Sequence, residues 1–170
     1  MEEKYNVLDI VRGTTVDGPG FRTAIYLAGC SHRCPGCHNP QTHDFSGGTL
    51  RDTQEIVALL GSNPLVRGVT LTGGEPMMQA AALCEIAGAA RAQGMNVWCY
   101  TGYTLEELLA QKDPDRMRLL GLIDVLVDGR YVARERSLDL LYRGSRNQRL
   151  IDVPATLERG EVRLYEPEPW

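Results

Sequence analysis

Gly29-Cys-Ser-His-Arg-Cys-Pro-Gly-Cys-His-Asn39 is the stretch that decides the fold, because it holds three thiols in the spacing C-x3-C-x2-C. No fourth cysteine follows nearby, although a closed structural zinc site takes four ligands and a [4Fe–4S] cluster has four irons to coordinate. Three thiolates therefore favour a cluster with one iron open to a ligand from outside the protein. The alternative is a zinc site that adds His32 or His38. The three thiols are those of Cys30, Cys34 and Cys37.

Further motifs flank this loop on both sides. They are Asp17-Gly-Pro-Gly-Phe-Arg22, Leu27-Ala-Gly-Cys30, Cys34-Pro-Gly-Cys37-His-Asn39, Thr70-Leu-Thr-Gly-Gly-Glu-Pro76, Asp124-Val-Leu-Val-Asp-Gly129 and Arg143-Gly-Ser-Arg-Asn-Gln-Arg149. Over about residues 9–152, the sequence with these motifs resembles the radical SAM superfamily. The DGPG and CPGC elements resemble activases of glycyl-radical enzymes. The short chain and the RGSRNQ segment select the family that activates anaerobic ribonucleoside-triphosphate reductases.

This resemblance implies a fold and a reaction. The fold is α/β, a partial, open (β/α) barrel of the radical SAM type with a mostly parallel curved sheet. A [4Fe–4S] cluster would cleave S-adenosyl-L-methionine reductively, and the resulting 5′-deoxyadenosyl radical would generate a glycyl radical on an anaerobic ribonucleotide reductase. Reduced flavodoxin or ferredoxin is the implied electron donor. The alternatives are an activase of the formate acetyltransferase type and a small zinc-binding interaction module.

The resemblance also assigns site residues. The three cysteines hold the cluster, and no other catalytic side chain is expected, because the cofactors supply the chemistry. The Gly-Gly-Glu turn at 73–75 would hold the methionine amino group, since glycine admits close backbone approach and carboxylate and carbonyl oxygens accept from an ammonium; a plain turn is the alternative. The residues expected at S-adenosylmethionine are Gly36, Cys37, His38, Gly73, Gly74, Glu75, Thr101 and Asp128.

The composition limits the function classes. With 170 residues the chain suits one domain, and we expect a single domain, 1–170, with a core at about 9–152 and a short C-terminal extension, 153–170. A net charge of −4 argues against a nucleic-acid partner. No apolar run approaches the roughly 18 residues of a membrane span, and the charged N-terminus shows no signal peptide. We therefore expect a cytoplasmic protein without a membrane partner.

Apolar stretches alternate with amphipathic ones, which predicts parallel βαβ units with right-handed crossovers. The chain is too short for an eight-unit barrel of roughly 250 residues. Residues 5–20 are expected to form a polar lead-in, 134–142 a helical stretch and 150–165 one or two short strands. Strands are expected at 21–28, 68–72, 96–101 and 123–127, and helices at 52–60, at 78–93, from 104 and from 113.

Polar or glycine-rich signals follow each expected strand. In parallel α/β folds ligands bind beyond the carboxyl ends of the strands, so these signals predict one site. For Asp128 the expected roles are a ribose hydroxyl or a cation, and a turn cap before Gly129 is the alternative; Thr101 has the same two interpretations. The signals are Cys30, Gly73-Gly74-Glu75, Thr101-Gly102 and Asp128-Gly129.

The remaining polar and sulfur-bearing residues carry weaker expectations. Cys84 and Cys99 are predicted to be small core residues, and His32 a loop residue. Arg22 is expected either to pair with a carboxylate near the cluster or to be solvated. Five arginines between residues 134 and 149 are a solvated face or a docking surface for a protein substrate. Gly36 stands where many superfamily members carry an aromatic residue, so no residue is assigned to stack on the adenine.

Overall fold

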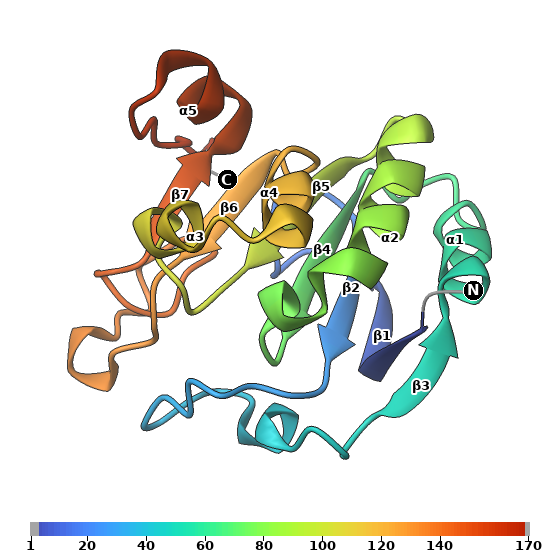
Figure 1. Ribbon diagram of the computed structural model, residues 1–170, viewed down its shortest axis with the longest axis horizontal. Coiled ribbons are helices and arrows are strands. Elements are labelled where there is room, and N and C mark those ends of the chain that lie inside the picture. The colour runs from blue at the N-terminus through green and yellow to red at the C-terminus, as the bar shows by residue number, and fades with distance from the viewer. Residues whose placement is uncertain (1–3, 169–170) are drawn as a thin grey trace.

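The computed structural model describes residues 4–168 and is built on one seven-stranded sheet (Figure 1). The strand order across the sheet is β3-β1-β2-β4-β5-β6-β7. Its edges, β3 and β7, do not pair with one another, so the sheet is open. The strands are β1 (Lys4–Thr14), β2 (Arg22–Leu27), β3 (Thr49–Asp52), β4 (Gly68–Gly73), β5 (Asn96–Tyr100), β6 (Val125–Asp128) and β7 (Arg149–Asp152).

The four central strands, β2, β4, β5 and β6, are parallel, and the pairs outside them are antiparallel. The expected α/β class is confirmed, but the sheet is mixed rather than mostly parallel. β1 and β3 were not predicted. Within residues 5–14 of β1, Tyr5 and Val7 are the buried residues and Asp9 is exposed, and register shifts interrupt the pairing with β2. The regular alternation of buried and exposed residues is therefore lost.

Between residues 4 and 168, five helices and three 3-10 turns lie between or after the strands. Where helices were predicted near residues 52, 78, 104 and 113, the structure confirms them, including the capping box of Thr104 and Glu107. Asp52 caps its helix through the Gln54 amide. The helices are α1 (Thr53–Leu60), α2 (Ala80–Ala92), α3 (Leu105–Gln111), α4 (Pro114–Leu120) and α5 (Val153–Arg159), and the turns are η1 (Pro40–His43), η2 (Pro76–Gln79) and η3 (Ala133–Glu135).

One prediction near the C-terminus was wrong. The stretch expected to be helical at 134–142 contains only the end of η3. Of the one or two short strands expected at 150–165, the structure has one, β7, and α5 follows it directly because Asp152 accepts from the Ala155 amide and Pro154 suits the first turn.

The main core lies between the helices and one face of the sheet. Alternate residues of the central strands, such as Ile25, Leu71 and Cys99, point to this face and are fully buried. Burial of this kind stabilises by about 1.5–3 kcal/mol for each large aliphatic side chain. Cys84 and Cys99 both belong to this core, which confirms their prediction as core residues.

The opposite face of the sheet carries a second, smaller cluster. Trp98 of β5 packs edge to face against Tyr142 and Tyr165, which come from the segments before and after β7. These two segments therefore cover the β5–β7 end of this face. Toward β2 and β4 the same face becomes polar, beginning with Arg22 and Thr70.

Arg22 is fully buried on this polar part of the face, and no carboxylate of residues 4–168 is hydrogen-bonded to it. Its guanidinium donates to Thr70 Oγ1 at 2.9 Å and to the carbonyls of Pro19 and Val69 at 3.0 Å, and it lies over the Trp98 ring at 5.6 Å. Desolvation lowers the pKa of Arg22 to about 10. Arg22 thus joins the DGPG turn to β4, and neither expected role, pairing with a carboxylate or solvation, holds.

Candidate metal centre and cofactor site

The cysteine loop, residues 28–48, runs along the edge of the sheet where β2 and β4 end (Figure 1). Backbone hydrogen bonds fix its two sides to each other: the Gly29 amide donates to the Thr42 carbonyl at 2.7 Å and the Cys30 amide to the His43 carbonyl at 3.4 Å. Its far end returns through β3, which pairs with β1. The loop is therefore held by the sheet at both ends.

All three thiols of this loop are free. Cys30 is buried and 8% exposed, while Cys34 and Cys37 are half-buried. Burial raises the pKa of the Cys30 thiol, and backbone N–H groups of His32 and Arg33 offset part of this rise. The thiols lie between the protein interior and the surface, where an external ligand can reach them.

The donor set fits an iron–sulfur cluster, since one short loop supplies three free thiols. A zinc ion needs all its ligands about 2.0–2.3 Å from one centre. A cubane instead presents a separate iron to each thiolate, and thiolate is the soft ligand that such clusters take.

The Gly73-Gly74 turn lies directly against this loop. The Gly74 amide donates to the Leu27 carbonyl at 2.7 Å and the Glu75 amide to the Gly29 carbonyl at 2.9 Å. A Cβ on Gly73 would lie 2.4 Å from the Leu27 nitrogen, and one on Gly74 would lie 2.5 Å from the Gly29 oxygen. Gly73 also has a φ of +95°, which favours glycine. Both glycines are therefore required for the turn to touch the loop.

Glu75 is fully buried, and its carboxylate accepts four hydrogen bonds. Oε1 accepts from the Met77 amide at 3.0 Å and from Thr101 Oγ1 at 2.8 Å. Oε2 accepts from the Gly102 amide at 2.8 Å and from His32 Nε2 at 2.8 Å. Glu75 thus links the cysteine loop to the ends of both β4 and β5.

Asp128 is buried, and protein groups already donate hydrogen bonds to both of its carboxylate oxygens. Its Oδ2 accepts from the Leu105 amide at 2.8 Å, and Arg149 donates to both of its oxygens at 3.0 and 2.5 Å. Asp128 therefore caps the start of α3 and pairs with β7. A contact with a ribose or a cation stays a prediction, and the expected turn cap is replaced by a helix cap.

Gly36 and His38 lie on the other side of the loop, against the segment that follows β6. A Cβ on Gly36 would lie 3.6 Å from the Tyr131 ring, and the rings of His38 and Tyr131 are 4.8 Å apart. Tyr131 thus puts an aromatic ring beside the glycine. Tyr131 was not predicted as a site residue, because the segment around it lies almost 100 residues from the cysteine loop and follows no periodic pattern.

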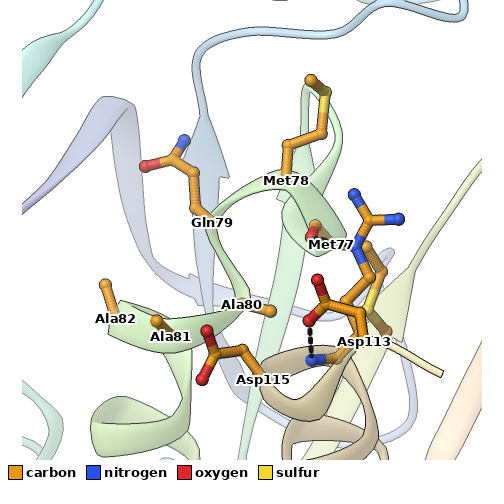
Figure 2. Close-up of a pocket in the computed structure, with 9 residues that line it drawn as sticks. Met77, Met78, Gln79, Ala80, Ala81, Ala82, Asp113 and Asp115 are labelled. Atoms are coloured by element: carbon orange, nitrogen blue, oxygen red, sulfur yellow. Dashed lines mark hydrogen bonds between the residues drawn. The ribbon is translucent and has the colours of Figure 1, made fainter. Parts of the chain in front are cut away.

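A hollow of about 310 Å³ lies behind the Gly-Gly-Glu turn, between η2 and the start of α4 (Figure 2). Asp113 accepts from the Arg116 amide at its rim. Arg116 Nε in turn donates to the Met77 carbonyl at 2.9 Å. On the other side of η2, the Met78 sulfur lies 3.7 Å from Ser31 Oγ in the cysteine loop. Helix α4 therefore supports the turn from behind.

The structure thus brings the cysteine loop, the Gly-Gly-Glu turn and the end of β5 together, as predicted. It adds His32, which was expected to be only a loop residue. The sequence signal for His32 was weak, since a single histidine between two cysteines suggests a ligand or a loop residue rather than a partner of Glu75. No helix within residues 4–168 is long and apolar enough to cross a membrane.

This fold and site define a class: an α/β protein with an open sheet that presents a cysteine-rich loop at the carboxyl ends of its parallel strands. Comparison with known proteins agrees, since the family described as a 4Fe-4S single cluster domain matches residues 16–151. The chain is also similar to proteins named anaerobic ribonucleoside-triphosphate reductase-activating protein. One is from Vibrio cholerae serotype O1, 39% identical over 154 residues, which are 85% of this chain and 93% of that protein.

Others with the same name are from Escherichia coli K12, 36% identical over 153 residues (85% of this chain, 94% of that one), and Enterobacteria phage T4, 33% identical over 144 residues (79% and 86%). The chain belongs to the family of anaerobic ribonucleoside-triphosphate reductase-activating proteins, which carry a 4Fe-4S single cluster domain.

Proposed function

We propose that this chain is a radical SAM activase that generates a glycyl radical on an anaerobic ribonucleotide reductase. The observation that carries this proposal is the placement of three free thiols on a loop fixed against the Gly73-Gly74 turn, at the carboxyl ends of the parallel strands. Ligands of α/β folds bind at this edge. The names of the family members supply the reductase as the partner.

Each part of the site has a proposed task. Cys30, Cys34 and Cys37 hold a [4Fe–4S] cluster by three irons. When bound, a reduced cluster would give one electron to S-adenosylmethionine, whose C5′–S bond would break to yield methionine and a 5′-deoxyadenosyl radical that can take a hydrogen atom from a glycine Cα of the reductase. The polypeptide orients the two groups and keeps water away. The residues proposed at S-adenosylmethionine are Gly36, Cys37, His38, Gly73, Gly74, Glu75, Thr101 and Asp128.

Several parts of the proposal rest on the resemblance of the sequence. They are a single domain over residues 1–170 in a partial radical SAM barrel, a cytoplasmic location, and reduced flavodoxin or ferredoxin as the electron donor. The open sheet supports a partial barrel rather than a closed one, because its edge strands β3 and β7 do not pair with each other.

A docking surface for the reductase is proposed on the segment that follows β6. Arg134, Arg136 and Arg146 are exposed there, and the Arg146 amide donates to the Glu135 carbonyl, so they belong to one folded segment. Ala133 in this segment is next to Gly36 of the cysteine loop. Several positive charges this close to the cysteine loop would steer an acidic surface of the reductase toward the cluster.

A charge-reversal experiment tests this surface. We expect the double variant R134E/R146E to slow activation of the reductase by at least tenfold and to leave S-adenosylmethionine cleavage unchanged. R159E, at the exposed end of α5, is the matched control. Arg143 is avoided because its Nη1 donates to the Gln148 carbonyl at 2.7 Å and supports the fold. Equal activation by the wild type and R134E/R146E would refute the docking surface.

Anaerobic reconstitution tests the function itself. Wild-type protein supplied with iron and sulfide should bind close to four irons per chain, turn brown, and cleave S-adenosylmethionine when reduced. It should then produce the glycyl-radical signal in the reductase. A colourless protein with one zinc per chain would support the interaction module instead. Cleavage without radical formation on the reductase, but with radical formation on a formate acetyltransferase, would support the other activase.

A further inference from the structure

The middle of the cysteine loop has few attachments of its own. Among the described residues, the backbone hydrogen bonds of the loop to the rest of the protein lie at its two ends, whereas Cys37 bonds back only to Cys34. Between these points, His38 lies against the Tyr131 ring, and the His32 side chain, which is 5% exposed, lies 2.8 Å from Glu75 Oε2. His32 stands two residues from Cys30 and two from Cys34, so its position sets the position of both thiols.

His32 is enclosed on three sides. Its Nε2 donates to Glu75, and its ring meets the edge of the Tyr103 ring with a centroid distance of 4.6 Å. A Cβ on Gly102 would lie 2.5 Å from His32 Cδ2, so only glycine leaves room for the imidazole. Tyr103 is itself held, because the Arg116 guanidinium lies over its ring at 4.8 Å. The imidazole therefore occupies a site built for it at the end of β5.

Protein donors fill the hydrogen-bonding capacity of the Glu75 carboxylate. An ionised carboxylate has about four lone-pair positions, and four protein donors occupy them here, two on each oxygen. An ammonium group from a ligand would have to displace one of these donors. The carbonyl oxygens of the Gly-Gly-Glu turn, rather than the Glu75 side chain, are therefore better placed to accept from the methionine amino group.

From this geometry we infer that His32 and Glu75 form a positioning pair, which fixes the middle of the cysteine loop to the ends of β4 and β5 and so places the three thiols relative to the Gly73-Gly74 turn. This inference rests on the proposed function. It makes His32 and Glu75 positioning residues that act through the thiols and the turn. Outer partners of this kind usually change metal affinity or activity by about 10- to 100-fold when they are removed.

The first test measures the loop without any cluster. In the apoprotein under anaerobic conditions, the alkylation rate of each thiol is followed by mass spectrometry. We expect H32A and E75Q to speed the reaction of Cys30 by about tenfold, because the loop moves away from the sheet. Cys84 and Cys99 of the core serve as internal controls, and their rates should not change. S31A, an exposed neighbour in the same loop, is the matched control variant.

The second test measures the cluster and the substrate. After reconstitution, H32A should lose iron to a chelator about 10–100-fold faster than the wild type and bind S-adenosylmethionine at least tenfold more weakly. H32Q should restore most of both, because the glutamine amide can donate to Glu75 in place of the imidazole. In a double-mutant cycle, H32A/E75Q should cost little more than H32A alone, as expected for two residues that act through one contact.

Two outcomes would overturn the inference. One is wild-type Cys30 reactivity and wild-type iron retention in H32A, with circular dichroism confirming the fold. The other is an E75Q variant that binds S-adenosylmethionine tenfold more weakly while Cys30 reactivity and iron retention stay normal, since Glu75 would then act on the substrate directly. Failure of the proposed function looks different: the wild type would not take up four irons, and the thiol reactivity test would still report on the pair.

Discussion

The ion pair of Asp128 and Arg149 gives a quantitative prediction about stability. The Asp128 side chain is 1% exposed, and Arg149 supplies two of its three hydrogen bonds. In the variant R149M the carboxylate would stay buried with only the Leu105 amide as a donor. A buried charge that loses its partner costs about 3–5 kcal/mol. Because the Arg149 side chain is 32% exposed and water can replace part of it, we expect a loss of about 3 kcal/mol.

Arg149 also pairs with Glu106, but this second contact should contribute little. The Glu106 side chain is 59% exposed, and exposed pairs contribute about 0–1 kcal/mol. The variant E106Q is therefore the control that separates the two partners of Arg149. The double variant D128N/R149M should be more stable than R149M, because the neutral amide removes the buried charge and its oxygen can still accept from the Leu105 amide.

Urea unfolding of the apoprotein, followed by circular dichroism, measures these differences. With a slope of about 2 kcal/mol per molar urea for a chain of this size, R149M should lower the midpoint by about 1.5 M. E106Q should shift it by less than about 0.5 M. A midpoint for R149M within 0.5 M of the wild type would refute the argument that Arg149 compensates a buried charge.

A further variant, the single substitution D128N, decides the role of Asp128 at the substrate. If Asp128 is only a helix cap and ion-pair partner, D128N in reconstituted protein should bind S-adenosylmethionine within about threefold of the wild type. A tenfold loss of affinity, with the cluster intact, would instead support the predicted contact with the ribose.

Three further predictions follow from single contacts. G74A should lower the free energy of unfolding by about 2–3 kcal/mol in urea titrations, because its Cβ would meet the Gly29 carbonyl, whereas G88A, with nothing near its Cβ, should be neutral or stabilising; equal effects would contradict this. C84A should retain full iron uptake by elemental analysis and C34A should not, and reduced uptake by C84A would argue against its core role. Burial raises the pKa of Asp17 above its ordinary value of 3.8, so the folded state holds its proton longer and the free energy of unfolding should fall as the pH rises from about 4. In urea titrations at several pH values, the free energy of unfolding of D17N should fall less with rising pH than that of the wild type. An equal pH dependence of the two proteins would exclude Asp17 as the cause.

The parts of the fold that could be predicted are those with a local signal. The central strands and their helices were found because apolar runs, capping residues such as Thr104, and glycines at strand ends mark them directly. β1 and β3 could not be found in this way. Their stability comes from pairing with each other and with β2, and the exposed Asp9 and Leu50 hide the alternation on which the prediction depends.

In the candidate site, too, the parts with a local sequence signal could be predicted and the others could not. The cysteine spacing and the Gly-Gly-Glu turn are contiguous in sequence, and the structure brings them together as expected. The partners of these motifs are not contiguous: His32 meets Glu75 across 43 residues, and Tyr131 meets His38 from a different part of the chain. Contacts of this kind depend on the relative placement of whole strands, which no periodicity in a single sequence reports.

The attachment of the cysteine loop at both ends has a consequence for the polypeptide when no cluster is bound. β2 precedes the loop and β3 follows it, and both pair with β1, while the main core contains none of the three thiols. The sheet and the hydrophobic core therefore do not depend on these thiols for their packing. Iron and sulfide would be added to a loop whose two ends the sheet already holds in place.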